Sequence, residues 1–180
     1  MTTYVALIRG INVGATRKLP MAELRAHCAA DGLGEVKTYI QSGNIILSST
    51  DGADVLAARL KALIARRFEL DVPVILRTAT QWRSYAAGSP FPDAEAGRPN
   101  LLHICLSARP LADGAAAALQ ARAAAAERLA VKDGTLWCDF GESVGTSKLT
   151  PALFDKAAGS PVTARNWRTV QALAALLEDR

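Results

Sequence analysis

Two parts of the chain, residues 4–77 and 101–164, show the same succession of strand and helix patterns. Short apolar or alternating runs typical of strands are separated by longer runs with helical spacing, in the order strand, helix, strand, strand, helix, strand. This order is that of the ferredoxin-like unit. We therefore predict an α+β protein of two tandem ferredoxin-like (βαββαβ) halves, packed into one compact unit with an extra C-terminal helix.

The segment between the two parts predicts where the halves divide. Gly88 to Asn100 contains three prolines and two glycines, which interrupt helices and strands. The predicted boundaries are 1–87 for the first half, 88–99 for a linker, and 100–180 for the second half with its C-terminal helix. A chain of 180 residues can bury roughly 70% of its unfolded surface, so folding requires neither a disulfide nor a metal.

Local signals place the individual elements. Alternation predicts a strand over 35–41 with Val36, Thr38 and Ile40 on one face, and Asp133-Gly134 predicts a hairpin. An alanine-rich run predicts a thinly packed helix from Asp113 to about Ala126.

Polar residues follow the first strand and occupy the first hairpin. In a ferredoxin-like sheet, the end of the first strand and the following hairpin lie at the same edge. The topology therefore predicts that Arg9, Gly10 and Asn12 lie beside the hairpin residues. These are Gln41, Ser42, Gly43 and Asn44. Arg9 and Asn44 are expected to lie beyond the main apolar core.

The same geometry predicts a second polar cluster in the second half. Ser147 and Lys148 follow its third strand, and Arg165 and Asn166 end its fourth. The amino ends of two helices are expected there, which adds partial positive charge. We further expect the two clusters to face one cleft. The alternative is structural, with Asn166 serving only as a helix cap and the loop amides binding backbone groups.

Recognisable catalytic patterns are missing from the sequence. The chain has no Gly-x-Gly-x-x-Gly, no serine elbow and no run of metal ligands, so a catalytic activity is uncertain and no cofactor is identified. His103 and Cys105 would share a strand face, but no second ligand pair exists and no metal is predicted. Three widely spaced cysteines and the absence of an N-terminal leader or an apolar run of ~20 residues predict a cytoplasmic protein without membrane association.

Four stretches of the chain resemble a family of uncharacterised bacterial proteins, the domain-of-unknown-function family 1697. They are Leu7–Gly14, Thr38–Asn44, Ser147–Leu149 and Thr163–Val170. The resemblance implies a compact α+β protein of two similar ferredoxin-like halves and no established activity. The family usually has a second glycine where this chain has Ala15, and often a lysine where it has Ala172. The first difference weakens the expectation that the loop wraps closely around a phosphate.

Three functions fit these observations. The leading hypothesis is binding of a small anionic or nucleotide-like ligand, with charge from Arg9, Lys148 and Arg165. A nucleic-acid-binding module is the alternative, because the net charge is +4 and Tyr39 and Trp137 could stack on bases. The scattered charge predicts that any such binding is weak at physiological salt. The third is an enzyme acting on a phosphate-bearing substrate.

Overall fold

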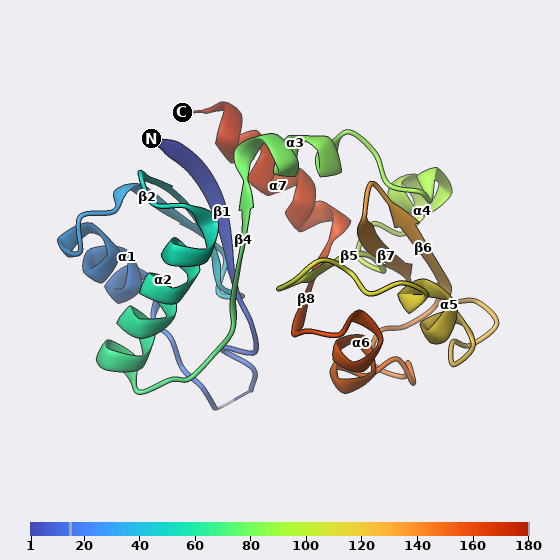
Figure 1. Ribbon diagram of the computed structural model, residues 1–180. Helices are drawn as coiled ribbons and strands as arrows, with labels where there is room; N and C mark the ends of the chain where they lie inside the picture. The colour runs from blue at the N-terminus through green and yellow to red at the C-terminus, as the bar shows by residue number, and fades with distance from the viewer. Residues whose placement is uncertain (15, 180) are drawn as a thin grey trace. The chain divides into compact units, whose positions relative to one another are not determined.

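The computed structural model describes residues 1–14 and 16–179. The chain divides into two compact units, Met1–Arg83 together with the end of the chain from Leu176, and Ser84–Ala175. Each unit contains one four-stranded antiparallel sheet with helices beside it (Figure 1).

The first sheet has the strand order β2-β3-β1-β4, and all its neighbours are antiparallel. Its elements in chain order are β1 (Thr2–Ile8), α1 (Met21–Ala30), β2 (Gly34–Tyr39), β3 (Asn44–Ser49), α2 (Ala53–Phe68) and β4 (Val74–Thr78). Helix α3 (Ala79–Ala86) follows directly. The two central strands are the first and third of the unit, as the ferredoxin-like order requires.

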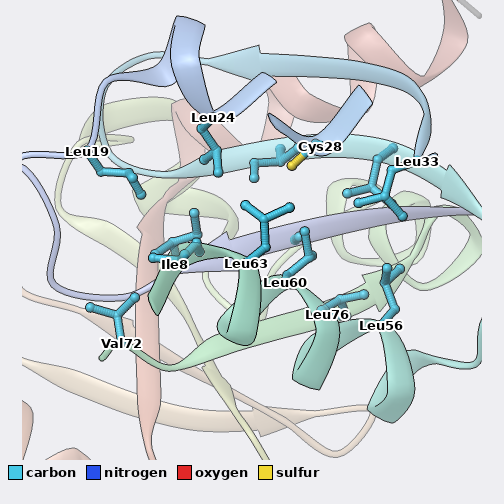
Figure 2. Packing of buried hydrophobic residues seen from close by; sticks show 14 of the residues in the cluster. Ile8, Leu19, Leu24, Cys28, Leu33, Leu56, Leu60, Leu63, Val72 and Leu76 are labelled. Carbon is cyan, nitrogen blue, oxygen red and sulfur yellow. The ribbon is translucent and has the colours of Figure 1, made fainter. Parts of the chain in front are cut away.

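Helices α1 and α2 cover one face of the first sheet. Alternate residues of β1, namely Tyr4, Ala6 and Ile8, belong to one apolar core. Leu24 of α1 and Leu60 of α2 join that core and are fully buried (Figure 2). These are the helical faces that the spacing of apolar residues predicts, since residues three and four apart share one side of a helix.

The second sheet repeats this order as β6-β7-β5-β8, again fully antiparallel. Its unit contains α4 (Pro92–Gly97), β5 (Leu102–Ser107), α5 (Ala115–Gln120), β6 (Arg128–Lys132), β7 (Thr135–Asp139), α6 (Pro151–Ala158) and β8 (Val162–Asn166). The chain ends in α7 (Trp167–Glu178). The predicted fold class, two ferredoxin-like halves with an extra C-terminal helix, is confirmed.

The last strand of each half ends in the same way. Arg77 in β4 and Arg165 in β8 each donate from Nη1 to the carbonyl of the preceding residue, at 2.7 and 2.8 Å. The next residue, Thr78 or Asn166, accepts a backbone N–H from three residues further on and caps the following helix. The predicted cap at Asn166 is confirmed.

Two local predictions were wrong. The helix predicted over 113–126 ends at Gln120, because its alanines bury little surface and the Gln120 amide binds the beginning of β6 instead. Its Nε2 donates to the carbonyl of Glu127 at 3.0 Å, and its Oε1 accepts from the N–H of Leu129 at 2.8 Å. Ile40 does not share the buried side of β2, since its φ of 47° turns the chain and leaves its side chain 51% exposed.

No helix in the described part of the chain is long and apolar enough to cross a membrane.

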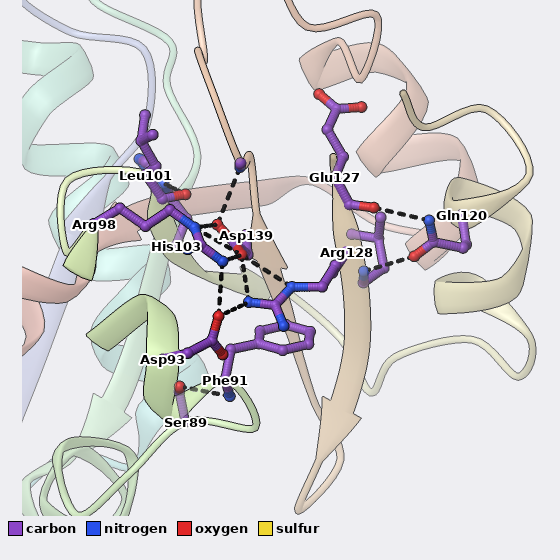
Figure 3. Close-up of polar contacts among 12 residues, drawn as sticks. Ser89, Phe91, Asp93, Arg98, Leu101, His103, Gln120, Glu127, Arg128 and Asp139 are labelled. Carbon is purple, nitrogen blue, oxygen red and sulfur yellow. Dashed lines mark hydrogen bonds and ion pairs between the residues drawn. The ribbon is translucent and has the colours of Figure 1, made fainter. Parts of the chain in front are cut away.

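A buried carboxylate holds the second unit together at the end of β7. Asp139 is fully buried and accepts hydrogen bonds from Arg98 at 2.6–3.1 Å and from Arg128 at 2.7–3.0 Å (Figure 3). The N–H of Gly141 adds a third donor at 3.0 Å. Asp93 binds both guanidinium groups from outside, at 2.9 and 2.7 Å. Two positive and two negative groups therefore form one neutral network.

The same network fixes the segment that was predicted to be a linker. Helix α4 forms within it, and Arg98 connects its end to β7. The guanidinium of Arg128 lies 4.6 Å from the centroid of the Phe91 ring, a cation–π contact (Figure 3). Lys132 of β6 donates to the carbonyl of Gly88. Residues 88–98 are thus held against the sheet of their own unit.

Loss of the Asp139 charge should destabilise the protein and change its response to acid. Burial alone would raise the pKa of Asp139, but the hydrogen bonds from Arg98, Arg128 and Gly141 outweigh burial and lower it. A lowered pKa contributes stability that is present at neutral pH and is lost as the pH falls below about 4. Asp139→Asn should therefore cost about 3 kcal/mol at pH 7 and reduce the fall in unfolding free energy between pH 5 and pH 3.

Urea unfolding at several pH values measures both effects. Asp133→Asn is the matched control, because Asp133 is exposed in the β6–β7 turn. Equal stability of the Asp139→Asn variant and the wild type at pH 7 would contradict this account of the network.

Candidate functional site

The loop after β1 is compact and has an unusual backbone. Four of its described residues have positive φ: Gly10 (66°), Asn12 (52°), Gly14 (60°) and Arg17 (51°). The backbone N–H of Asn12 donates to the carbonyl of Arg17 at 3.0 Å, so the loop closes on itself. Positive φ is uncommon outside glycine and asparagine, and such residues gather where tertiary contacts impose them. Ala15, where the family usually has a second glycine, lies outside the described residues.

The Asn12 side chain connects this loop to two other segments. Its Nδ2 donates to the carbonyl of Gln41 at 2.7 Å and to the carbonyl of Leu19 at 3.0 Å. Its Oδ1 accepts from the N–H of Leu19 at 2.8 Å. One amide thus joins the loop after β1, the start of α1 and the hairpin between β2 and β3. Asn12 therefore meets the hairpin at Gln41, as the topology predicts.

Close packing of Gly43 against β1 fixes the position of the hairpin. The N–H of Ile8 donates to the carbonyl of Gly43 at 2.8 Å. A Cβ on Gly43 would lie 3.0 Å from the Ile8 carbonyl oxygen and 2.8 Å from Cδ1 of Ile11, and its φ is 80°. Only glycine can adopt this positive φ and also leave room for β1 and Ile11.

Asn44 is part of the core rather than of the exposed edge. Its side chain is fully buried, and its Nδ2 donates to the carbonyl of Tyr39 at 3.1 Å and to Oγ of Ser42 at 2.9 Å. The expectation that Asn44 lies beyond the core was wrong, because the residue begins the central strand β3 opposite Leu7. Its amide closes the hairpin from within.

Cationic and uncharged polar groups are exposed together at this edge. Arg17 and Lys18 are exposed and Arg9 is half-buried, whereas Gln41 and Ser42 are exposed on the hairpin. Nη1 of Arg17 lies 3.4 Å from the position that a Cβ on Gly10 would occupy. Our sequence reasoning missed Arg17 and Lys18 because it weighed the glycine and asparagine pattern and not the charge inside the loop.

In the second unit, the first two predicted residues lie in a turn before α6. Oγ of Ser147 accepts from the N–H of Leu149 at 3.1 Å, and Lys148 is exposed. Thr150 caps α6 by accepting from the N–H of Leu153 at 3.3 Å. The carboxyl ends of β7 and β8 lie at one edge of the sheet, because both face the start of β5.

The other two predicted residues have structural contacts within their own unit. Arg165 is 9% exposed, and its Nη1 donates to Oγ1 of Thr163 and to the carbonyl of Ala164, both at 2.8 Å. Burial lowers the pKa of Arg165 to about 10. Asn166 accepts from the N–H of Thr169 at 2.9 Å as a helix cap. These contacts favour the structural alternative for Arg165 and Asn166.

Of the two aromatic residues considered for base stacking, Trp137 lies in the interior of the second unit. Trp137 is 1% exposed and packs on Trp167, with ring centroids 5.8 Å apart. Tyr39 is half-buried at the edge strand β2. The proposed stacking role of Trp137 was wrong, because its ring belongs to the interior of the second unit.

The cysteines are buried and free, as core residues would be. Burial raises the pKa of Cys28 to about 11 and that of Cys105 to about 12, so neither thiol forms the reactive thiolate near pH 7. Burial likewise lowers the pKa of His103, whose Nδ1 lies 3.1 Å from the carbonyl of Leu101. Among residues 1–14 and 16–179, no group of three or more His, Cys, Asp or Glu could hold a metal ion.

Removal of the Asn12 amide should destabilise the first unit. Asn12→Ala leaves the N–H of Leu19 and the carbonyl of Gln41 without their partner and places alanine at positive φ, so a cost of about 2–3 kcal/mol is expected. Urea or thermal unfolding measures this cost. The control is Asn100→Ala at an exposed position, where a change within about 0.5 kcal/mol is expected. If Asn12→Ala were as stable as Asn100→Ala, the hydrogen bonds of the Asn12 side chain would not contribute to the stability of the first unit.

Comparisons with known proteins agree with the fold. One similar solved structure is that of the conserved bacterial protein SP0830 from Streptococcus pneumoniae, with 24% sequence identity and a TM-score of 0.72 over 98% of each chain. A search of curated proteins gave no match. The family described as "Protein of unknown function (DUF1697)" matches residues 1–137. With most of its length matched, and with the resemblance seen in its motifs confirmed, the chain belongs to the DUF1697 family.

Proposed function

We propose that the chain binds a small anionic or nucleotide-like ligand at the edge of the first unit. The site consists of the basic loop, defined as residues 9–18, and the hairpin turn 40–43. The observation that supports it best is the Asn12 amide, which joins these two segments at 2.7 Å. Because the loops are held in advance, a ligand that binds them does not have to bear the entropic cost of ordering them.

The charge of the basic loop favours an anion. Arg9, Arg17 and Lys18 supply three cations. Guanidinium groups bind phosphate or carboxylate with two parallel hydrogen bonds, and an ammonium group adds a compact charge. Gln41 and Ser42 offer an exposed amide and an exposed hydroxyl for directional bonds.

The contacts divide the predicted ligand-binding residues by role. We assign contact with the ligand to Arg9, Gln41 and Ser42, to which Arg17 and Lys18 are added. Gly10, Asn12 and Asn44 would shape the site, because the latter two use their amides for loop contacts. In the second unit, Lys148 and Ser147 stay candidates for a separate contact.

We also propose a cellular location for the protein and an origin for its two halves. We place the protein in the cytoplasm, because three buried free cysteines suit a reducing compartment. We also infer that the halves arose by duplication, since both sheets share one strand order and both end in an arginine followed by a capping residue.

Charge removal from the basic loop should abolish ligand-dependent stabilisation without unfolding the protein. For wild type, we expect phosphate or a mononucleotide at ten times its dissociation constant to add about 1.4 kcal/mol of stability, or a few degrees in Tm. In the double variant Arg17→Gln with Lys18→Gln, the added stability should fall below about 0.3 kcal/mol while Tm without ligand stays nearly the same. Thermal unfolding with phosphate, mononucleotide and the parent nucleoside measures both quantities.

The matched control carries Arg66→Gln and Arg67→Gln, two exposed cations at the end of α2. It removes the same net charge from another surface and should keep the ligand response. If the control variant lost the ligand-dependent stabilisation to the same extent, the loss would be explained by net charge alone and not by the basic loop. A wild type that none of the anions stabilises would contradict the proposed function.

A further inference from the structure

Strand β6 is an edge strand of the second sheet, and its outer side is paired over only part of its length. On its inner side it pairs with β7, to which the turn Asp133-Gly134 connects it. Lys132 and Thr135 close this turn, and the residues of an antiparallel pair alternate between bonded and unbonded positions. The N–H and carbonyl groups of Leu129 and Val131 therefore point away from β7.

The side chain of Gln120, at the end of α5, pairs with the first part of this edge. Its Nε2 donates to the carbonyl of Glu127 at 3.0 Å, and its Oε1 accepts from the N–H of Leu129 at 2.8 Å (Figure 3). A side-chain amide thus occupies the position that the peptide group of a neighbouring strand would take. In the described chain, the next two groups along the edge, the carbonyl of Leu129 and the N–H of Val131, have no hydrogen-bond partner.

The edge is open at Val131 because the helix beside it carries only alanines there. Ala116 and Ala117 precede Gln120 by about one turn and lie on the same side of α5. Their methyl groups are too short to reach the strand as the Gln120 side chain does. The result is a hollow of about 530 Å³ between β6 and the segment 110–117. The side chain of Val131 lines this hollow and is 48% exposed.

We propose that this hollow binds a short extended peptide segment of a partner protein, which adds a strand to the edge of β6. The peptide backbone would donate to the carbonyl of Leu129 and accept from the N–H of Val131, and so continue the pairing that the Gln120 amide begins. Alternate side chains of the peptide would lie in the hollow against Val131, Leu111 and Pro110, which favours valine, isoleucine or leucine there.

The Gln120 side chain also limits the length of strand that can bind. A longer strand, such as β6 of a second copy, would meet this side chain at Leu129, where the N–H is already bonded. The open part of the edge therefore suits a short segment. This site is separate from the basic loop of the first unit and does not rest on the function proposed there.

Selection of random octapeptides displayed on phage against the full chain tests the proposal. We expect enriched peptides with apolar residues at alternate positions, and synthetic copies should shift the NMR amide signals of Ala117, Leu129 and Val131 in a saturable manner. Methylation of single peptide nitrogens should weaken binding at least tenfold at alternate positions only, because every second N–H of a strand faces its neighbour. Absence of any enriched peptide, or saturable shifts confined to other segments, would overturn the proposal.

Ala116→Gln should close the open edge, because it places a second amide four residues before Gln120. Four residues advance a helix by about 6 Å and two residues advance a strand by about 6.6 Å, so the new amide would meet the carbonyl of Leu129 and the N–H of Val131. Binding of the selected peptides should fall at least tenfold. Ala118→Gln, at an exposed position on another side of α5, is the matched control and should bind as wild type does.

Val131→Pro tests the edge independently of the helix. It removes the outward N–H and keeps the ladder to β7, since Ala130 and Lys132 carry those bonds. Binding should again fall at least tenfold, and thermal unfolding checks that each variant is folded. Unchanged binding by either edge variant, or equal weakening by Ala118→Gln, would contradict the assignment. Dimerisation of the peptide-free wild type that Ala116→Gln abolishes would also overturn it, because the occupant would then be a second copy.

Discussion

The geometry of the candidate site in the first unit depends on the Asn12 amide. It uses its N–H groups and its oxygen to bind Gln41 and Leu19, which belong to the hairpin and to the entry of α1. Without it, the loop after β1 would be held by few backbone bonds and by residues at positive φ. A buried or half-buried amide with all its groups satisfied specifies one arrangement, since any other leaves polar groups unpaired.

Paired cations and exposed cations have different roles in this protein, and this difference separates structure from candidate function. In the second unit, Asp139 is buried between Arg98 and Arg128, and the charges cancel within the network. In the first unit, Arg17 and Lys18 are exposed on a loop that is fixed by uncharged amides. A cation that stabilises a fold does so by forming ion pairs within the protein. A cation exposed on a fixed loop can instead bind an anion from solution.

Local patterns in the sequence predicted the strands, the Asp133-Gly134 hairpin and the antiparallel order. This order in turn predicted the contact between Asn12 and the hairpin that joins β2 and β3. Burial of Asn44 could not be predicted, because it follows from the central position of β3 in the sheet. The Asp139 network was also missed, since Arg98 and Asp139 are 41 positions apart and no periodicity connects them. The early end of α5 depends on the Gln120 side chain, which competes with helix propensity through bonds formed only in the folded unit.

We propose that the basic loop and the adjacent turn form a preformed anion site. NMR titration of the wild-type chain with phosphate, and then with a mononucleotide, tests it most directly because it reports every amide at once. The account predicts that the largest shifts occur within residues 9–18 and 40–44, with small changes elsewhere. Shifts concentrated around Ser147 and Lys148, or no saturable shift in either segment, would contradict it.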